Sequence, residues 1–277
     1  MRKNLIALLA LVMMVAALVG CGTENAAQGK QERARTVTDI DGTEVTIPAN
    51  VERIADLWHA NNQVVLLLGG ADKLVTTTKN VQGLPWFAQV YPRIKEISAP
   101  VKGTDVNWEE VEKEKPQVVL ASSKEQIEMA RKNGYTAVRV NFSTYDGLRK
   151  TVKITGDVLG GDAPKNAEAY LAYLDEKTKF TDERTKNLSD ADRPVVLHIV
   201  GGDDLFKNGN VIEAPYWAKP WGNPDADSVA LGELWLAHMF YPDKVSADVV
   251  AERAKKFYET FYGVPFTGTV ADGIRRK

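Results

Sequence analysis

Residues 162–188 constrain this chain most, because their pattern predicts one long helix between two α/β bodies. Asp162 is placed to cap the first amide groups, and Pro164 falls in the first turn, where its missing N–H costs nothing. One helical face is then formed by Ala167, Tyr170, Leu171, Leu174, Thr178 and Phe180. About 25 helical residues span roughly 37 Å. A rigid helix of this length between two lobes predicts a cleft, where a ligand is expected.

Strand and helix patterns alternate through residues 36–145, which predict a complete first lobe. Two alternating runs around Asp41-Gly42 predict a hairpin at its start. The expected strands are 54–58, 74–78, 118–121 and 136–142, and the expected helices are 61–68, 107–115 and 124–133. A loop holding Pro85-Trp86 and Tyr91-Pro92 is expected before the last strands. This alternation predicts an α/β fold with a parallel sheet flanked by helices.

The second half of the chain predicts a smaller body. Residues 146–192 form the connecting helices, of which the first is expected at 146–159. Residues 193–277 predict a shortened second lobe with a strand at 195–200 and helices at 228–240 and 247–262. The expected fold class is therefore α/β with two lobes joined by one long helix, the second lobe being reduced and largely helical.

The N-terminal 20 residues are typical of an export signal, with Arg2 and Lys3 before a short apolar run. The run ends at Leu18-Val19-Gly20-Cys21, which resembles the lipobox of bacterial lipoproteins. The resemblance implies cleavage before Cys21 and a lipid anchor on its sulfur. A buried or free thiol after an ordinary signal peptide is the alternative. Residues 21–35 are polar and predict a lipidated tether.

Composition narrows the class of partner. The net charge of −2 offers no basic surface for nucleic acid, and 44% hydrophobic residues are enough for a real core. Because Cys21 is the only cysteine, the body has no disulfide and no thiolate metal site.

Candidate ligand contacts follow the expected strands, because open parallel sheets bind ligands beyond the carboxyl ends of their strands. The candidates at strand ends are Trp58, His59, Asn61, Thr78, Lys79, Ser122, Ser123, Asn141, Phe142, His198 and Gly202. Aromatic residues of Pro-containing loops add flat walls, namely Trp86, Tyr216, Trp217 and Trp221. The alternatives are a core tryptophan at 58, a helix-start histidine at 59, and simple packing of the loop aromatics.

Two histidines are candidate metal contacts. His59 and His198 can complete the coordination of a bound metal complex through imidazole nitrogen, although His198 also fits a structural role in its strand. The chain has no nucleophile elbow, P-loop, dinucleotide glycine pattern or HExxH pair, so no enzyme and no intrinsic cofactor are expected. Asp203-Asp204 can hold a metal or act as a catalytic acid, but a plain turn is the alternative.

The order of several sequence blocks carries a family resemblance. The blocks are VERIADLW, LLLGGADKLV, NWEEVEKEKPQVVLAS, the long helix, VVLHIVGGD and PWGNPDADSVALGELWLAHMFYPDKV. Together they resemble the iron-complex and cobalamin periplasmic binding proteins of ABC importers, whose two lobes are joined by one rigid helix. This resemblance implies a ferric siderophore, haem or corrinoid as ligand, delivered to a permease driven by an ATPase. Glu109 matches a glutamate that docks onto the permease; an ordinary first-turn acid is the alternative.

The chain departs from that family after the VVLHIVGGD block. Asn210-Val211-Ile212-Glu213 passes almost directly into Ala214-Pro215-Tyr216, so one or more βα units are missing and no second docking glutamate can be assigned. The prediction is a lipid-anchored substrate-binding protein on the extracytoplasmic face of a membrane, in a periplasm or at the outer cell surface, that captures a ferric siderophore. Alternatives are cobalamin, haem or another metal complex as ligand, a metal-dependent enzyme at Asp203-Asp204, or a scaffold that binds nothing.

Overall fold

The computed structural model describes residues 33–196, 211–212, 215, 217, 226–270 and 275–276. The described residues from Ala34 onward belong to one compact unit. The predicted signal peptide, Cys21 and most of the tether lie outside the described residues. No helix within the described part of the chain is long and apolar enough to cross a membrane.

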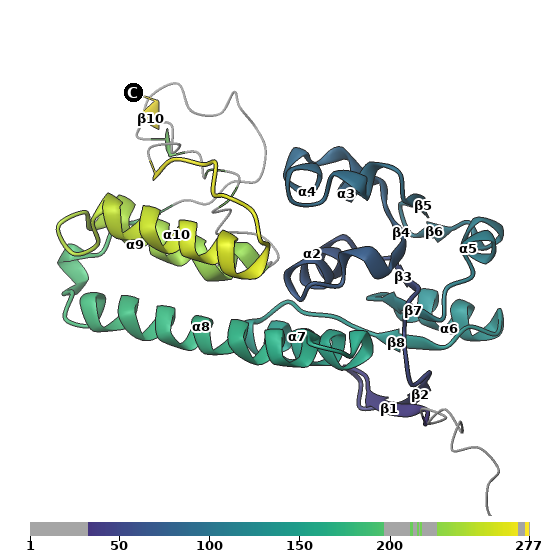
Figure 1. Ribbon diagram of the computed structural model, residues 1–277. Helices are drawn as coiled ribbons and strands as arrows, with labels where there is room; N and C mark the ends of the chain where they lie inside the picture. Colours follow the sequence, from purple (N-terminus) through teal and green to yellow (C-terminus); the bar gives the residue numbers. More distant parts are fainter. Residues whose placement is uncertain are drawn as a thin grey trace, which may run out of the picture. The chain divides into compact units, whose positions relative to one another are not determined.

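The centre of this unit is a six-stranded sheet with the order β6-β5-β4-β3-β7-β8 (Figure 1). Its strands are β3 (Ile54–Asp56), β4 (Leu74–Thr78), β5 (Ser98–Lys102), β6 (Asp105–Val106), β7 (Val118–Ala121) and β8 (Ala137–Arg139). All neighbouring pairs are parallel except β5 and β6, which form an antiparallel edge. The predicted α/β class with a parallel sheet is confirmed.

Helices cover both faces of the sheet. They are α2 (His59–Leu67), α5 (Trp108–Glu114), α6 (Lys124–Lys132) and α7 (Tyr145–Leu159). Leu120 of β7 packs in one apolar cluster with Val64 of α2 and Val152 of α7. Its neighbour Val119 packs in a second cluster with Ile127 of α6. Successive strand residues therefore point to opposite buried faces, which explains the unbroken apolar run in β7.

The prediction of a loop between β4 and the helix at 107–115 is wrong in part. This segment contains α3 (Lys79–Gly83), α4 (Pro85–Val90), a 3₁₀ turn at Pro92–Lys95, and strands β5 and β6. Thr78 caps α3 by accepting from the amide of Val81, and Pro85 opens α4. These elements are too short to show periodicity, and Pro100 inside β5 resembles a strand breaker.

The N-terminal hairpin is confirmed. Strands β1 (Arg35–Thr38) and β2 (Glu44–Ile47) pair antiparallel around Asp41-Gly42. Gly42 adopts a φ of +84°, a conformation that other residues reach only with strain.

The predicted long helix is confirmed as α8 (Ala163–Thr185), with Pro164 in its first turn. Asp162 is its N-cap residue, but the aspartate side chain accepts no cap hydrogen bond, so that expectation is wrong. The reason is local, since Asp162 has a helical backbone (φ −81°, ψ −9°) rather than the extended one that aims a capping side chain at the free amides. Lys177 and Thr181 lie on the buried face of α8, whereas the expected Thr178 and Phe180 are only half-buried.

Beyond α8 the described residues are mostly helical. A π-helix at Ser228–Gly232 continues into α9 (Glu233–Phe240), and α10 (Ala247–Phe261) follows. The π-helix and α9 lie along α8, and α10 packs on both of them (Figure 1). Short strands β9 (Val211–Ile212) and β10 (Arg275–Arg276) pair antiparallel, and 3₁₀ turns occur at Ala71–Lys73 and Asp190–Asp192. Residues 197–200 of the expected strand lie outside the described residues, and the division into two lobes stays a prediction.

Candidate functional site

Three predicted contact residues come together at the carboxyl edge of the sheet. Trp58 follows β3 and is the N-cap residue of α2, and Phe142 follows β8. The Trp58 ring lies 4.7 Å from the Phe142 ring and 6.4 Å from the His59 ring, measured between centroids. Phe142 is buried, Trp58 is half-buried and His59 is exposed. We call these three residues the Trp58 wall.

A buried polar network supports the Trp58 wall from behind. The carboxylate of Asp56 accepts hydrogen bonds from the Trp58 backbone N–H (3.1 Å) and from Nδ2 of Asn61 (2.9 Å). The Thr155 hydroxyl of α7 donates to Oδ1 of Asn61 over 2.9 Å. Complete burial raises the pKa of Asp56 to about 8, outweighing the two hydrogen bonds, which lower it. Asn61 was predicted as a ligand contact; its side chain is fully buried and bonded to Asp56 and Thr155, and contact with a ligand stays a prediction.

The ends of β4, β7 and β8 contribute residues with local roles. Thr78 is buried and caps α3, whereas Lys79 is exposed and bonds to Gln82. Ser123 caps α6 by accepting from the amide of Gln126. The half-buried Asn141 accepts from the Thr151 hydroxyl through its backbone oxygen. These contacts explain the local structure, and whether these residues also meet a ligand stays a prediction.

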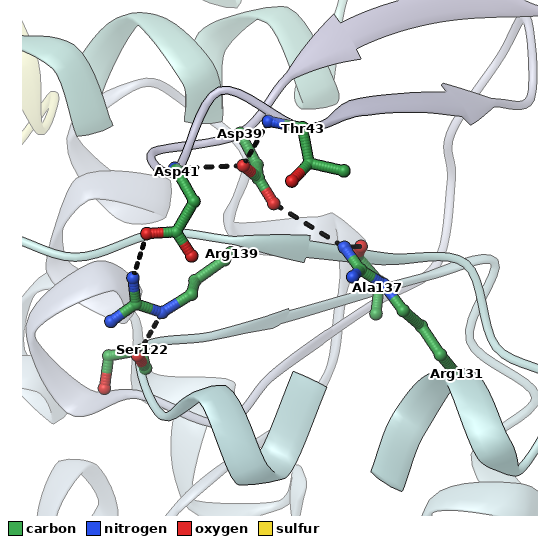
Figure 2. A network of polar contacts seen from close by, with 7 residues as sticks. All are labelled: Asp39, Asp41, Thr43, Ser122, Arg131, Ala137 and Arg139. Carbon is green, nitrogen blue, oxygen red and sulfur yellow. Dashed lines mark hydrogen bonds and ion pairs between the residues drawn. The ribbon is translucent and has the colours of Figure 1, made fainter. Parts of the chain in front are cut away.

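Arg139 ties the N-terminal hairpin to this edge of the sheet, as Figure 2 shows. Its Nε donates to the backbone oxygen of Ser122 (2.8 Å), and its Nη1 lies 2.6 Å from Oδ1 of Asp41. Asp39 accepts from the amides of Asp41 and Thr43 and forms an ion pair with Arg131. The sequence analysis missed Arg139, although an arginine closing an otherwise apolar strand was a usable signal.

A second group of aromatic residues joins α4 to α10. Trp86, predicted as a binding wall, is buried and donates from Nε1 to the Tyr258 hydroxyl over 2.9 Å. Its ring lies 5.2 Å from the Tyr262 ring. Trp217, also predicted, lies 5.1 Å from the Phe266 ring, which in turn contacts Tyr258. We call Trp86, Trp217, Tyr258, Tyr262 and Phe266 the aromatic cluster.

A buried carboxylate closes the aromatic cluster. Asp227 accepts from the Tyr262 hydroxyl (2.5 Å) and from the Tyr258 hydroxyl (3.4 Å). Burial and the Asp227 carboxylate hold the pKa of Tyr262 well above its ordinary value, so the phenol stays protonated and donates. The sequence analysis missed Tyr258 and Tyr262, although their spacing of four residues puts both on one side of the helix expected at 247–262.

The remaining predicted residues divide into described and undescribed ones. Glu109 is exposed in the first turn of α5. Among the described residues, no group of three or more His, Cys, Asp or Glu side chains is placed to hold a metal. Outside the described residues lie His198, Gly202, Asp203, Asp204, Tyr216, Trp221 and Cys21.

No protein-family model matches the chain. It is 26% identical over 216 residues to the uncharacterized ABC transporter substrate-binding lipoprotein YvrC of Bacillus subtilis, a match covering 72% of this chain and 65% of YvrC. A shorter match, 36% identical over 71 residues, joins it to the molybdate-binding protein MolA of Haemophilus influenzae and covers 25% of this chain and 20% of MolA. Each match thus spans less than two thirds of the relative's own length.

Solved structures agree with the fold over more of the chain. MolA bound to molybdate superposes with a TM-score of 0.72 at 17% identity, covering 84% of this chain and 99% of MolA. A periplasmic solute binding protein of Veillonella parvula gives a TM-score of 0.70 at 19% identity, covering 88% of this chain and 97% of that one. At these identities the likeness concerns the fold alone. The chain therefore has the fold of periplasmic binding proteins and is similar in sequence to a substrate-binding lipoprotein of an ABC transporter.

Proposed function

We propose that this chain is the substrate-binding component of an ABC transporter and takes its ligand at the carboxyl edge of the sheet. The observation that carries the proposal is the Trp58 wall, where exposed His59 stands beside a half-buried indole at the place where open parallel sheets bind ligands. The Asp56 network fixes the start of α2 behind this wall, which orders the site before a ligand binds.

The partners follow from the same role. A permease driven by an ATPase would receive the ligand, with the exposed Glu109 as a docking contact on the first lobe. Lipidation of Cys21 would hold the protein on the extracytoplasmic face of a membrane, and the YvrC relative is named as a lipoprotein. The relatives and solved structures compared above are named as binding proteins, which supports a role without catalysis or an intrinsic cofactor.

An iron complex such as a ferric siderophore is the first ligand candidate. The half-buried indole of Trp58 and the exposed imidazole of His59 suit a bulky ligand with flat, partly apolar surfaces. The imidazole of His59 is also able to meet the metal of such a complex directly. Cobalamin and haem share these properties and are included in the test.

Molybdate is the second candidate, because MolA is named as a molybdate-binding protein. A free oxyanion needs charged or N–H donors at its site. Cationic groups at the strand ends of the described sheet are exposed Lys79 after β4, exposed Lys102 at the end of β5 and half-buried Arg139 at the end of β8.

The experiment compares these ligands on the full chain purified in detergent. Tryptophan emission and isothermal titration calorimetry are recorded with ferrichrome, ferric enterobactin, haem, cobalamin and sodium molybdate. We expect an iron complex to bind with a Kd of about 1 μM or tighter, a binding free energy of about −8 kcal/mol. Trp58→Ala should weaken binding at least tenfold. Trp108→Phe, on α5 and stacked on Tyr135, is the matched control and should not.

The outcomes separate the ligand from the role. Binding of molybdate alone would show the iron complex to be wrong and leave the transport role standing. Absence of binding for all five ligands would contradict the proposed function.

A further inference from the structure

Asp56 is the most deeply buried acid near the candidate site, with no exposed surface. It ends β3, directly before the segment that carries Trp58 and His59. A carboxyl group in this position costs several kcal/mol of desolvation if ionised, so its hydrogen-bond partners must compensate. Those partners come from the same helix that begins at the Trp58 wall.

Side chains from four elements converge behind Trp58. Asn61 of α2 links Asp56 to Thr155 of α7, as described above. Nδ2 of Asn62 donates to the backbone oxygens of Asp56 (3.1 Å) and Trp58 (3.0 Å). Oδ1 of Asn62 accepts from the Thr77 hydroxyl of β4 over 2.7 Å. The backbone at Trp58 is thus held both by the Asp56 carboxylate and by Asn62.

The network has two complete hydrogen-bond arrangements. In the one described, both Asp56 oxygens accept, which is the arrangement of an ionised carboxylate. If the Asp56 oxygen that faces Asn61 carried a proton, its O–H and Nδ2 of Asn61 would be two donors facing each other. Turning the Asn61 amide over restores the bonds, because Oδ1 then accepts from Asp56 and Nδ2 donates to the Thr155 hydroxyl.

Few charges surround this carboxyl group. The titratable residue of α2 is His59, three positions from Asp56, and the facing residues of β4 are Thr76 and Thr77. β7 contributes only apolar residues. On α7 the buried partner is Thr155, and the charged residues Asp146, Arg149, Lys150, Lys153 and Asp157 are all at least partly exposed. Burial, rather than a neighbouring charge, raises the pKa of Asp56.

We propose that Asp56 is a positioning residue for the Trp58 wall, and that gain or loss of its proton switches the wall between two hydrogen-bond arrangements. In the protonated arrangement the Trp58 N–H donates to a neutral carboxyl group in place of a carboxylate, so the bond that fixes the start of α2, and with it the packing of Trp58 on Phe142, is weaker. Where the proposed function holds, ligand affinity changes with the same transition. The inference rests on the proposed function only in this last step.

The test reads Trp58 directly. The full chain is labelled with 5-fluorotryptophan, and the Trp58 signal is assigned by its loss in Trp58→Phe. In ¹⁹F NMR between pH 6 and 10, we expect one transition of the Trp58 signal with a midpoint near 8. It should persist in His59→Gln, be absent in Asp56→Asn, and move to higher pH in Asn61→Ala, which removes a hydrogen bond to the ionised form. An Asp56 that keeps one protonation state between pH 6 and 10 would not produce a pH transition at Trp58.

Several results would overturn the proposal. One is a Trp58 signal that does not change between pH 6 and 10, and another is a transition that survives in Asp56→Asn or vanishes in His59→Gln. If Asp56→Asn does not fold, the wild-type, His59→Gln and Asn61→Ala titrations still decide the question.

Ferrichrome titrations at pH 6.5 and 9.5 test the last step. We expect its Kd to differ at least fivefold between these pH values in the wild type and less than twofold in Asp56→Asn. An equal Kd in the wild type would contradict the coupling of Asp56 to the ligand. Absence of ferrichrome binding with an intact Trp58 transition would contradict this ligand and support the positioning role.

Discussion

The indole Nε1 of Trp86 donates a hydrogen bond to the hydroxyl of Tyr258, 2.9 Å away and 172 residues further along the chain. Trp86 belongs to α4, which follows β4 of the sheet, and Tyr258 belongs to α10. The bond therefore joins the sheet-containing part of the protein to its C-terminal helices. Asp227 lies behind it and orders both Tyr258 and Tyr262.

Replacement of Tyr258 by phenylalanine tests this connection. The change leaves the buried Trp86 N–H without its acceptor and removes one donor to Asp227. We expect the free energy of unfolding to fall by about 1–3 kcal/mol, measured by urea denaturation. Tyr145→Phe is the matched control, because Tyr145 is 55% exposed, and should change stability by less than about 0.5 kcal/mol. Equal midpoints for Tyr258→Phe and the wild type would contradict the role of this bond.

The pKa of Asp56 predicts a pH-dependent stability. It is raised from 3.8 to about 8 in the folded chain, so between these values the folded state holds a proton that the unfolded state has lost. The stabilisation is complete below about pH 4 and is lost as pH rises through the folded value. We expect this group to lower the free energy of unfolding by up to about 1.4 kcal/mol per pH unit between pH 5 and 7.

Urea denaturation of the wild type and Asp56→Asn at each pH from 5 to 9 measures this contribution. The slope against pH should be shallower in the variant by that amount, because asparagine does not titrate. Parallel stability curves for the wild type and Asp56→Asn would show that Asp56 has the same pKa in the folded and the unfolded chain.

Lys177 on α8 and Glu233 on α9 form an ion pair in which the lysine side chain is fully buried and the glutamate is 27% exposed. Burial lowers the pKa of Lys177, and the Glu233 carboxylate opposes that shift. Glu233→Gln leaves a buried ammonium group without its counter-charge, and we expect a loss of about 3 kcal/mol. Lys177→Met combined with Glu233→Gln should recover most of this loss.

The exposed pair Lys153–Glu168 is the control for that experiment, with side chains 55% and 68% exposed. Glu168→Gln should cost less than about 1 kcal/mol. If Glu233→Gln costs no more than Glu168→Gln, the buried pair does not hold α9 against α8.

Gly70 lies at a close approach between the end of α2 and the end of α7. A Cβ atom there would stand 2.5 Å from Cδ2 of Leu159, whose side chain is itself buried. We expect Gly70→Ala to lower the unfolding temperature in calorimetry, at a cost of about 1–3 kcal/mol. Gly83→Ala is the control, since nothing lies within 4 Å of its Cβ position, and should be within about 1 kcal/mol of the wild type. A smaller effect at position 70 than at position 83 would mean that Leu159 gives way freely.

Much of the structure of residues 36–145 was predictable because its signals are local. Asp41-Gly42 predicted the hairpin, the apolar run at 118–121 predicted a strand, and Pro164 predicted the start of α8 within a residue or two. The rule for carboxyl ends of parallel strands placed Trp58 and Phe142 in one wall although they are far apart in the chain. Residues 79–106 were mistaken for a loop because their helices and strands are shorter than one period of a reliable pattern.

Other features depend on contacts that have no local signature. Asn61 and Thr78 have the chemistry of ligand contacts, but the surrounding elements bury them and use their hydrogen bonds. Lys177 is buried on the apolar face of α8 because Glu233 of a later helix forms an ion pair with it.

The sequence by itself determined the α/β class, the long helix α8 and the residue types at the strand ends, because periodicity, capping and turn chemistry act between near neighbours in the chain. Only the tertiary structure decided which polar side chains are buried and which partners they have. It joined Trp86 to Tyr258 and enclosed Asp56 beneath Trp58, because desolvation depends on every element that packs around a group.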